Sequence, residues 1–148
     1  MFVACGVWLV GLGGYFLFGR PPLLSEDLRF MGASAMQVEL ALPHLASWLR
    51  RVFTVTGGFM AGCGVLTIFV GVRVIPQDLK GTGIALGCTG LLTVATMSST
   101  NFALGSDFKW LLLVPAIAWL LGLVSYLIGG QSAQVIAAIL QIKRGGRR

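Results

Sequence analysis

Charged side chains are scarce in this sequence. Of its 148 residues, 11% are charged and 56% are hydrophobic, whereas a soluble domain carries about 25% charged residues to cover its surface. This scarcity excludes a water-soluble fold, a disordered chain and a nucleic-acid-binding module. The four longest stretches without Asp, Glu, Lys, Arg or His are residues 1–19, 52–72, 81–106 and 110–142. Because about 20 apolar residues span a bilayer core, the sequence predicts an all-α polytopic membrane protein with a four-transmembrane-helix bundle.

Helix-breaking residues set the limits of these spans. The expected spans are about residues 2–18, 52–74, 81–100 and 108–128, all within one domain, residues 1–148. The first span ends before Pro21, because proline cannot continue a helix. Pro43 fits the first turn of a helix, and we expect one long helix from about residue 43 to 74. After Gly129–Gly130, residues 131–148 form a basic amphipathic tail that either extends the fourth span or lies on the membrane surface.

The connection between the first two spans is predicted to hold an interfacial helical segment. Ser25, followed by two acidic residues, is typical of a helix start. It predicts a short helix over residues 26–31 that ends at Gly32. Ser34 is placed to cap a second short turn that ends before Pro43.

Groups that carry chemistry are missing from the predicted spans. No ionisable side chain lies at mid-depth, which argues against a proton-coupled antiporter, because such carriers keep a charged group there. Cys5, Cys63 and Cys88 contain no C-x-x-C pair, and His44 is the only histidine. Most enzyme mechanisms need a positioned acid, base or metal. We therefore predict that the protein is not an enzyme and has no catalytic residue, metal or cofactor.

Glycines at helical spacing form the strongest pattern in the sequence. Small residues at such spacings let helix backbones approach closely in lipid. We expect them to pack the four spans against one another, with a dedicated oligomer face as the alternative; Gly6 and Gly13 lie on a similar row in the first span. The predicted helix-packing residues are Gly57, Gly58, Ala61, Gly62, Gly64, Gly83, Gly87 and Gly90.

A polar run, residues 96–101, ends the third predicted span. Its hydroxyls and amide have two interpretations. They bond back to the backbone of their own helix and cap its end, or they line a small pocket near one face of the membrane. The candidate polar-pocket residues are Ser98, Ser99, Thr100 and Asn101.

The distribution of Lys and Arg predicts the topology, because cytoplasmic loops carry an excess of these residues. With both termini in the cytoplasm, that side holds six of the 11 basic residues and the other side five. Four of the six cluster in the tail, which favours this orientation. The expected partners are membrane lipids, together with other membrane protein subunits or a second copy of the chain, and no nucleic acid.

Most of the chain resembles a known group of proteins. The segment Pro22–Gly32 is acidic and leucine-rich, and Arg51-Val52-Phe53 and Gly57-Gly58-Phe59-Met60 follow it. This arrangement is similar to small bacterial four-span membrane proteins of the broad DoxX-like group. The resemblance implies the inner membrane of a bacterium and a role accessory to a redox or thiol system, and it transfers no catalytic residue.

Two functions remain open at this stage. The preferred one is a non-catalytic membrane protein that packs against other membrane proteins or lipids as an accessory or structural subunit. The alternative is a small channel or carrier for a neutral or weakly polar solute, which uses the polar run. A redox protein or membrane enzyme is the least favoured interpretation.

Overall fold

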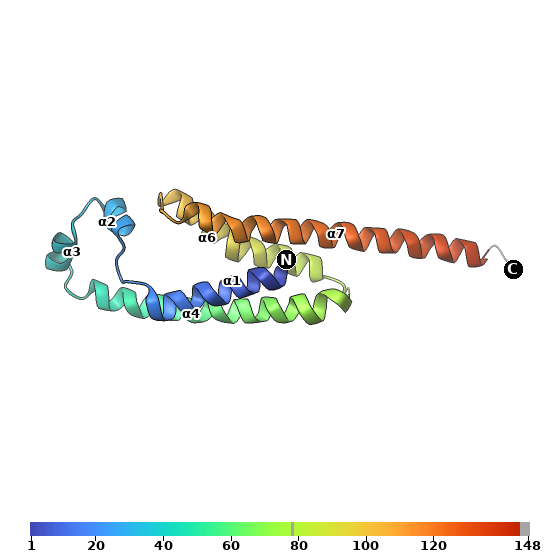
Figure 1. Cartoon of the computed structure of the whole chain (residues 1–148), viewed down its shortest axis with the longest axis horizontal. Helices are drawn as coiled ribbons and strands as arrows, with labels where there is room; N and C mark the ends of the chain where they lie inside the picture. The colour runs from blue at the N-terminus through green and yellow to red at the C-terminus, as the bar shows by residue number, and fades with distance from the viewer. Residues whose placement is uncertain (78, 146–148) are drawn as a thin grey trace.

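The computed structural model describes residues 1–77 and 79–145, with side chains described as far as residue 129. The described residues are helical wherever they form regular structure. Four helices are long and apolar enough to span a membrane (Figure 1). They are Phe2–Gly19, Leu45–Gln77, Thr82–Ala103 and Lys109–Gly129. The prediction of an all-α chain with four such helices is confirmed.

Three of the four spans contain a π-helical turn. The first span is α1, Phe2–Gly14, followed by the π-turn η1, Tyr15–Gly19. The second is α4, Leu45–Phe69, followed by the π-turn η2, Val70–Val74, and the short 3₁₀ helix η3, Ile75–Gln77. The third is α5, Thr82–Gly90, the π-turn η4, Leu91–Ala95, and α6, Thr96–Ala103. The fourth begins α7, Lys109–Gly145.

Two short helices, α2 (Ser25–Met31) and α3 (Ala35–Ala41), fill the first connection as the sequence predicted. Gly32 ends α2 in the left-handed conformation, with φ 64°. Ser34 caps α3 by accepting a hydrogen bond from the Gln37 backbone N–H. The start of α2 differs from the prediction, because its capping acceptor is not Ser25. The N-cap residue is Leu24, and the Asp27 carboxylate in the first turn accepts from its backbone N–H at 2.9 Å.

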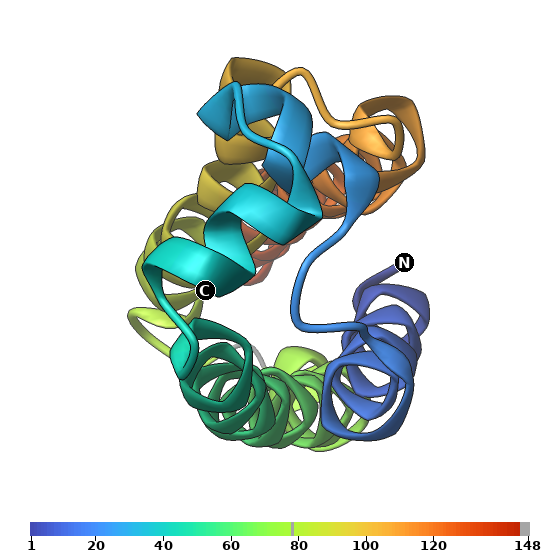
Figure 2. The ribbon, with the colours of Figure 1, turned by 90° about the vertical axis from the view of Figure 1, so that its left-hand side faces the viewer.

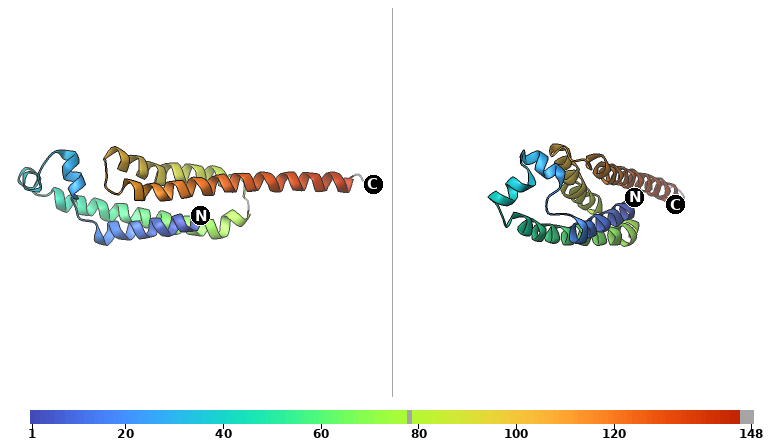
Figure 3. Two further views of the ribbon diagram at one scale, coloured as in Figure 1. Left: turned by 45° about the horizontal axis from the view of Figure 1, so that its top comes forward. Right: turned by 60° about the vertical axis from the view of Figure 1, so that its left-hand side comes forward.

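Two helices extend beyond the rest of the bundle. The helical run Leu45–Gln77 has 33 residues and is about 50 Å long at 1.5 Å per residue, so the expectation of one long second helix is confirmed. It begins at Leu45, so Pro43 stands two residues before the helix and not in its first turn as expected. Helix α7 continues through Gly129–Gly130 to Gly145, as Figure 3 shows. The sequence left two arrangements open for the tail, and in the structure the tail extends the fourth span. Residues 146–148 and the amphipathic character of the tail lie outside what is described.

Helices α1 and α4 pack backbone to backbone along a row of glycines. The helices are antiparallel, with Gly13 beside Gly57 and Gly6 beside Gly64. A methyl group on Gly64 would lie 2.6 Å from the Gly6 carbonyl oxygen, and one on Gly13 would lie 2.6 Å from the Ala61 nitrogen. Only glycine leaves room for this approach, which lipid-embedded helices use in place of the hydrophobic effect.

The third span packs on α7 in a different way, with a large side chain laid over glycine. The Trp119 ring covers Gly90, where an added methyl group would overlap the indole. Its Nε1 donates to the Leu86 carbonyl oxygen at 3.0 Å. Gly83 and Gly87 continue this face toward the side chains of Leu127 and Leu123.

The α1–α4 pair and the pair formed by the third span and α7 meet at one end of the bundle, where α1 contacts α7. The Phe2 ring meets the Trp119 ring edge to face, with centroids 5.2 Å apart. The Cys5 thiol donates to the Pro115 carbonyl oxygen at 3.7 Å. The buried core is small and comprises Phe2, Cys5, Leu9, Leu86, Val94 and Trp119. Figure 2 views the bundle from the opposite end, where α2 and α3 lie nearest the viewer.

Two of the predicted packing glycines make no helix contact within this chain. Gly58 and Gly62 are exposed on α4, and methyl groups built on them would meet no atom within 4 Å. They neighbour the packed row in sequence, but the 100° turn per helical residue carries them off the face that meets α1. The expectation that they pack the spans of one molecule together is therefore wrong for this pair.

Candidate functional site

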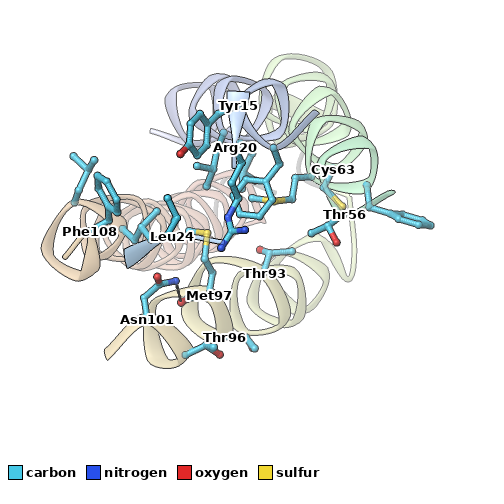
Figure 4. A pocket seen from close by; sticks show the side chains of 18 of the residues that line it. Tyr15, Arg20, Leu24, Thr56, Cys63, Thr93, Thr96, Met97, Asn101 and Phe108 are labelled. Carbon is cyan, nitrogen blue, oxygen red and sulfur yellow. Dashed lines mark hydrogen bonds between the residues drawn. The ribbon is translucent and has the colours of Figure 1, made fainter. Parts of the chain in front are cut away.

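A cavity of about 740 Å³ lies between the four spans. It occupies the part of the bundle toward α2 and the α6–α7 turn, and the packed core of Phe2 and Trp119 occupies the part toward the N-terminus. Figure 4 shows its wall from close by. Its wall within the spans comprises Leu9, Leu12, Tyr15, Phe16, Thr56, Phe59, Met60, Cys63, Leu92, Thr93, Thr96, Met97, Thr100, Asn101, Phe108, Leu111 and Leu112.

Two of the π-turns supply residues to this wall. Tyr15 and Phe16 come from η1, and Thr93 comes from η4. The wide turn of η4 is marked by Thr96, whose hydroxyl donates to the Leu91 carbonyl five residues back at 2.8 Å. A π-turn inserts one residue into a helix and shifts the face that follows it, and such turns are frequent at functional sites. Here the turns lie where the helices part around the cavity.

Arg20 is the cationic group of the cavity wall. It follows directly after η1, and its side chain is only 10% exposed. Its guanidinium lies over the Phe53 ring, 3.7 Å from the centroid, and 5.3 Å from that of Phe16. It pairs with the Asp27 carboxylate at 3.3 Å. The aromatic rings and Asp27 thus hold a nearly buried positive charge at the end of the first span.

Helix α2 covers the end of the cavity and is fastened to the α6–α7 turn. The Glu26 carboxylate, which lines the cavity, accepts from the Ser106 hydroxyl and from the Asp107 backbone N–H, both at 2.9 Å. Ser106 is almost fully buried. On the outer side of α2, Arg29 pairs with the Asp107 carboxylate at 2.9 Å. Glu26 makes two charge-assisted hydrogen bonds, one of them to buried Ser106, whereas both side chains of the Arg29–Asp107 pair are exposed and such pairs contribute little. Glu26 is therefore the main attachment of this cover.

The side wall of the cavity between α4 and η4 reaches the outer surface of the bundle. Phe59 of α4 is 73% exposed and Leu92 of η4 is 74% exposed, although both line the cavity. Helix α4 packs mainly on α1, and the third span packs mainly on α7. In a membrane, this side faces lipid, because Phe59 and Leu92 both lie well inside their spans.

The structure places half of the predicted polar-pocket residues at the cavity. Thr100 and Asn101 line it. Ser98 is buried but is not part of the cavity wall, and Ser99 is exposed and donates to the Ala95 carbonyl at 2.9 Å. Asn101 lines the cavity and also donates to the Met97 carbonyl. Both interpretations of the polar run therefore apply, and Asn101 fits both of them.

Sequence reasoning missed other residues that line the cavity. Thr56 and Cys63 lie in the glycine-rich second span, and Thr93 lies one turn before the polar run. Arg20 was counted only for topology. One signal for it was present: it is the first charge after 19 uncharged residues, and prolines follow it. No pattern in one sequence links it to residues in the other spans.

The described residues contain no group of three His, Cys, Asp or Glu side chains that could hold a metal ion. The chain matches no protein-family model, no curated protein and no solved structure. The site is therefore interpreted from its own geometry.

Proposed function

We propose that this chain is a non-catalytic membrane protein that binds a small, largely apolar molecule in the cavity between its spans. The cavity volume carries the proposal. At about 740 Å³ it lies within the range of about 300–1,000 Å³ that is typical of small-molecule sites, which are mostly apolar with a few polar groups. Of the functions left open by the sequence, this geometry favours binding or carriage of a solute.

The packed end of the bundle supports binding or carriage over an open channel. Phe2, Cys5, Leu86 and Trp119 fill the space between the helices there, each no more than 6% exposed. A continuous pore needs room along the whole bundle, and this core leaves none. A molecule that enters the cavity therefore leaves by the same opening unless the helices rearrange.

We place the protein in the inner membrane of a bacterium with both termini in the cytoplasm. The supporting observation is the basic C-terminal tail, because Lys and Arg concentrate on the cytoplasmic side. In this orientation, α2 and α3 lie on the extracytoplasmic side, and the cavity occupies the outer half of the bundle.

Two cysteines offer a matched test of the proposal. Cys63 lines the cavity, and Cys88 is exposed on the outside of α5. The Cys63→Phe variant fills the cavity, and the Cys88→Phe variant adds the same bulk toward lipid. Mass spectrometry of small molecules extracted from gently purified protein should find a compound bound to wild type and Cys88→Phe and lost from Cys63→Phe. Equal recovery from all three would contradict the proposal.

A second candidate function is the accessory role that the DoxX-like resemblance implies. The observation that favours it is the open pair Gly58 and Gly62, whose added methyl groups would meet no atom within 4 Å. A small-x-x-x-small pair on a lipid-facing helix lets another helix approach closely. Cross-linking in native membranes should yield an adduct with wild type that Gly62→Leu loses. An adduct unchanged by that substitution would remove this candidate.

A further inference from the structure

The polar groups of the cavity wall are of two kinds, hydrogen-bond acceptors and donors. Thr56 and Thr93 give their hydroxyl protons to carbonyl oxygens of their own helices, at 2.9 and 2.6 Å. Their oxygen atoms therefore remain as acceptors. Arg20 is a pure donor with five N–H groups, and its two hydrogen bonds, to Pro21 and Asp27, are both long at 3.3 Å. Figure 4 shows Arg20 and Thr93 pointing into the space between the helices.

The charges at this end of the cavity are already partnered. Arg20 pairs with Asp27, and the Glu26 carboxylate accepts from Ser106 and from the Asp107 backbone. A cationic ligand would meet the Arg20 charge. An anionic ligand would have to displace Asp27 from Arg20, and it would also be repelled by Glu26 in the same wall. Since an unpaired charge in an apolar site is costly, an uncharged head group fits best.

The route into the cavity adds a second requirement. Phe59 and Leu92 expose the wall to lipid, so a ligand that enters there is already dissolved in the bilayer. Arg20 stands at the end of the first span, at the depth where the polar head of a membrane-dissolved amphiphile lies.

We infer that the ligand is an uncharged amphiphile, with an apolar body in the cavity and a hydroxyl-type head between Arg20 and the threonines. The head accepts a hydrogen bond from the Arg20 guanidinium and donates one to a threonine oxygen such as that of Thr56, which lies about one helical turn from Phe53, the ring beneath Arg20. This inference rests on the proposed function and names the class of molecule that the cavity takes.

The test compares head groups on one chain length. Protein in phosphatidylcholine nanodiscs is mixed with 1-decanol, decane, decyl sulfate or decyltrimethylammonium at equal mole fractions in the membrane. The readout is the rate at which N-ethylmaleimide modifies Cys63 in the cavity, relative to the outward-facing Cys88 of the same chain. This ratio cancels any effect of the additive on the membrane as a whole.

Decanol should slow the modification of Cys63 at a mole fraction about tenfold lower than the other three compounds, as expected for one hydrogen bond to a charged group. In Arg20→Leu, decanol should lose its advantage over decane. Arg51→Leu removes an exposed charge from the same end of the bundle and should keep the advantage. Thr56→Val, which preserves side-chain volume, should weaken decanol about threefold.

Three results would overturn the inference in distinguishable ways. Protection by decyl sulfate or decyltrimethylammonium that equals or exceeds that of decanol would make the ligand class wrong and leave cavity binding intact. An unchanged advantage of decanol in both Arg20→Leu and Thr56→Val would remove the head-group site. If none of the four compounds, decane included, protects Cys63 over Cys88, the proposed function fails as well.

Discussion

The two ends of the bundle differ both in the residues between the helices and in how closely the helices pack. Toward the N-terminus, the α1–α4 and α5–α7 pairs are joined by the Phe2 and Trp119 rings and by the Cys5–Pro115 contact. Toward α2, the same four helices part around a cavity of about 740 Å³. The difference predicts that the packed end contributes most of the bundle's stability, and it fits the proposal that the other end holds a ligand.

The largest effect is expected from removing the side chain that joins the two pairs. Trp119→Ala deletes the ring against Phe2 and Gly90 and the hydrogen bond to Leu86. It should lower the free energy of unfolding in detergent by about 3 kcal/mol, the cost of an emptied large-residue site. Trp110→Ala is the control, because Trp110 is 66% exposed, and it should cost much less. Equal losses for the two variants would show that the packed end has no special role.

The glycine contact of α1 with α4 offers a comparison within one helix. A methyl group on Gly64 would lie 2.6 Å from the Gly6 carbonyl oxygen, and one on Gly62 would meet nothing within 4 Å. Gly64→Ala should destabilise the protein by about 2 kcal/mol through overpacking. Gly62→Ala should leave stability equal or slightly higher, because alanine favours helix more than glycine. Thermal unfolding of both variants measures the difference, and similar melting temperatures would refute the contact.

A smaller effect is expected at the cover of the cavity. Glu26→Gln keeps the shape of the side chain and removes the charge that holds Ser106 and the Asp107 N–H. Charged acceptors bind more strongly than neutral ones, so α2 should loosen by about 1 kcal/mol. Hydrogen–deuterium exchange should become faster in α2 and stay unchanged in the spans. Glu39→Gln, on exposed α3, is the control, and equal exchange in both variants would deny Glu26 this role.

Much of the fold could be predicted from the sequence, because the need to place apolar residues in lipid shapes each segment locally. A stretch without charge must be a span. Gly32 marks a helix end through its left-handed backbone, and Ser34 marks one through its side-chain hydroxyl. The α1–α4 row was recognisable from the spacing of Gly57 and Gly64. The sequence does not show which glycines of that span make no contact. Gly58 and Gly62 fit the same small-residue pattern as Gly57 and Gly64 and differ only in the direction they face.

The cavity was harder to predict because its wall is assembled across spans. Thr100 and Asn101 belong to a visible polar run, but Thr56, Cys63 and Arg20 stand in unremarkable local contexts. Their roles depend on how far the helices part, which π-turns such as η1 and η4 help to set. No local pattern in a single sequence marks a π-turn, so these residues become recognisable only in three dimensions.

The reactivity of two native cysteines tests most directly whether one end is packed and the other hollow. Cys5 lies in the packed core at 2% exposure, and Cys63 lines the cavity. In nanodiscs without additives, N-ethylmaleimide should modify Cys63 and leave Cys5 unmodified over the same period, as resolved by peptide mass spectrometry. Modification of Cys5 as fast as that of Cys63 would contradict the packed end, and a Cys63 as inert as Cys5 would contradict the cavity.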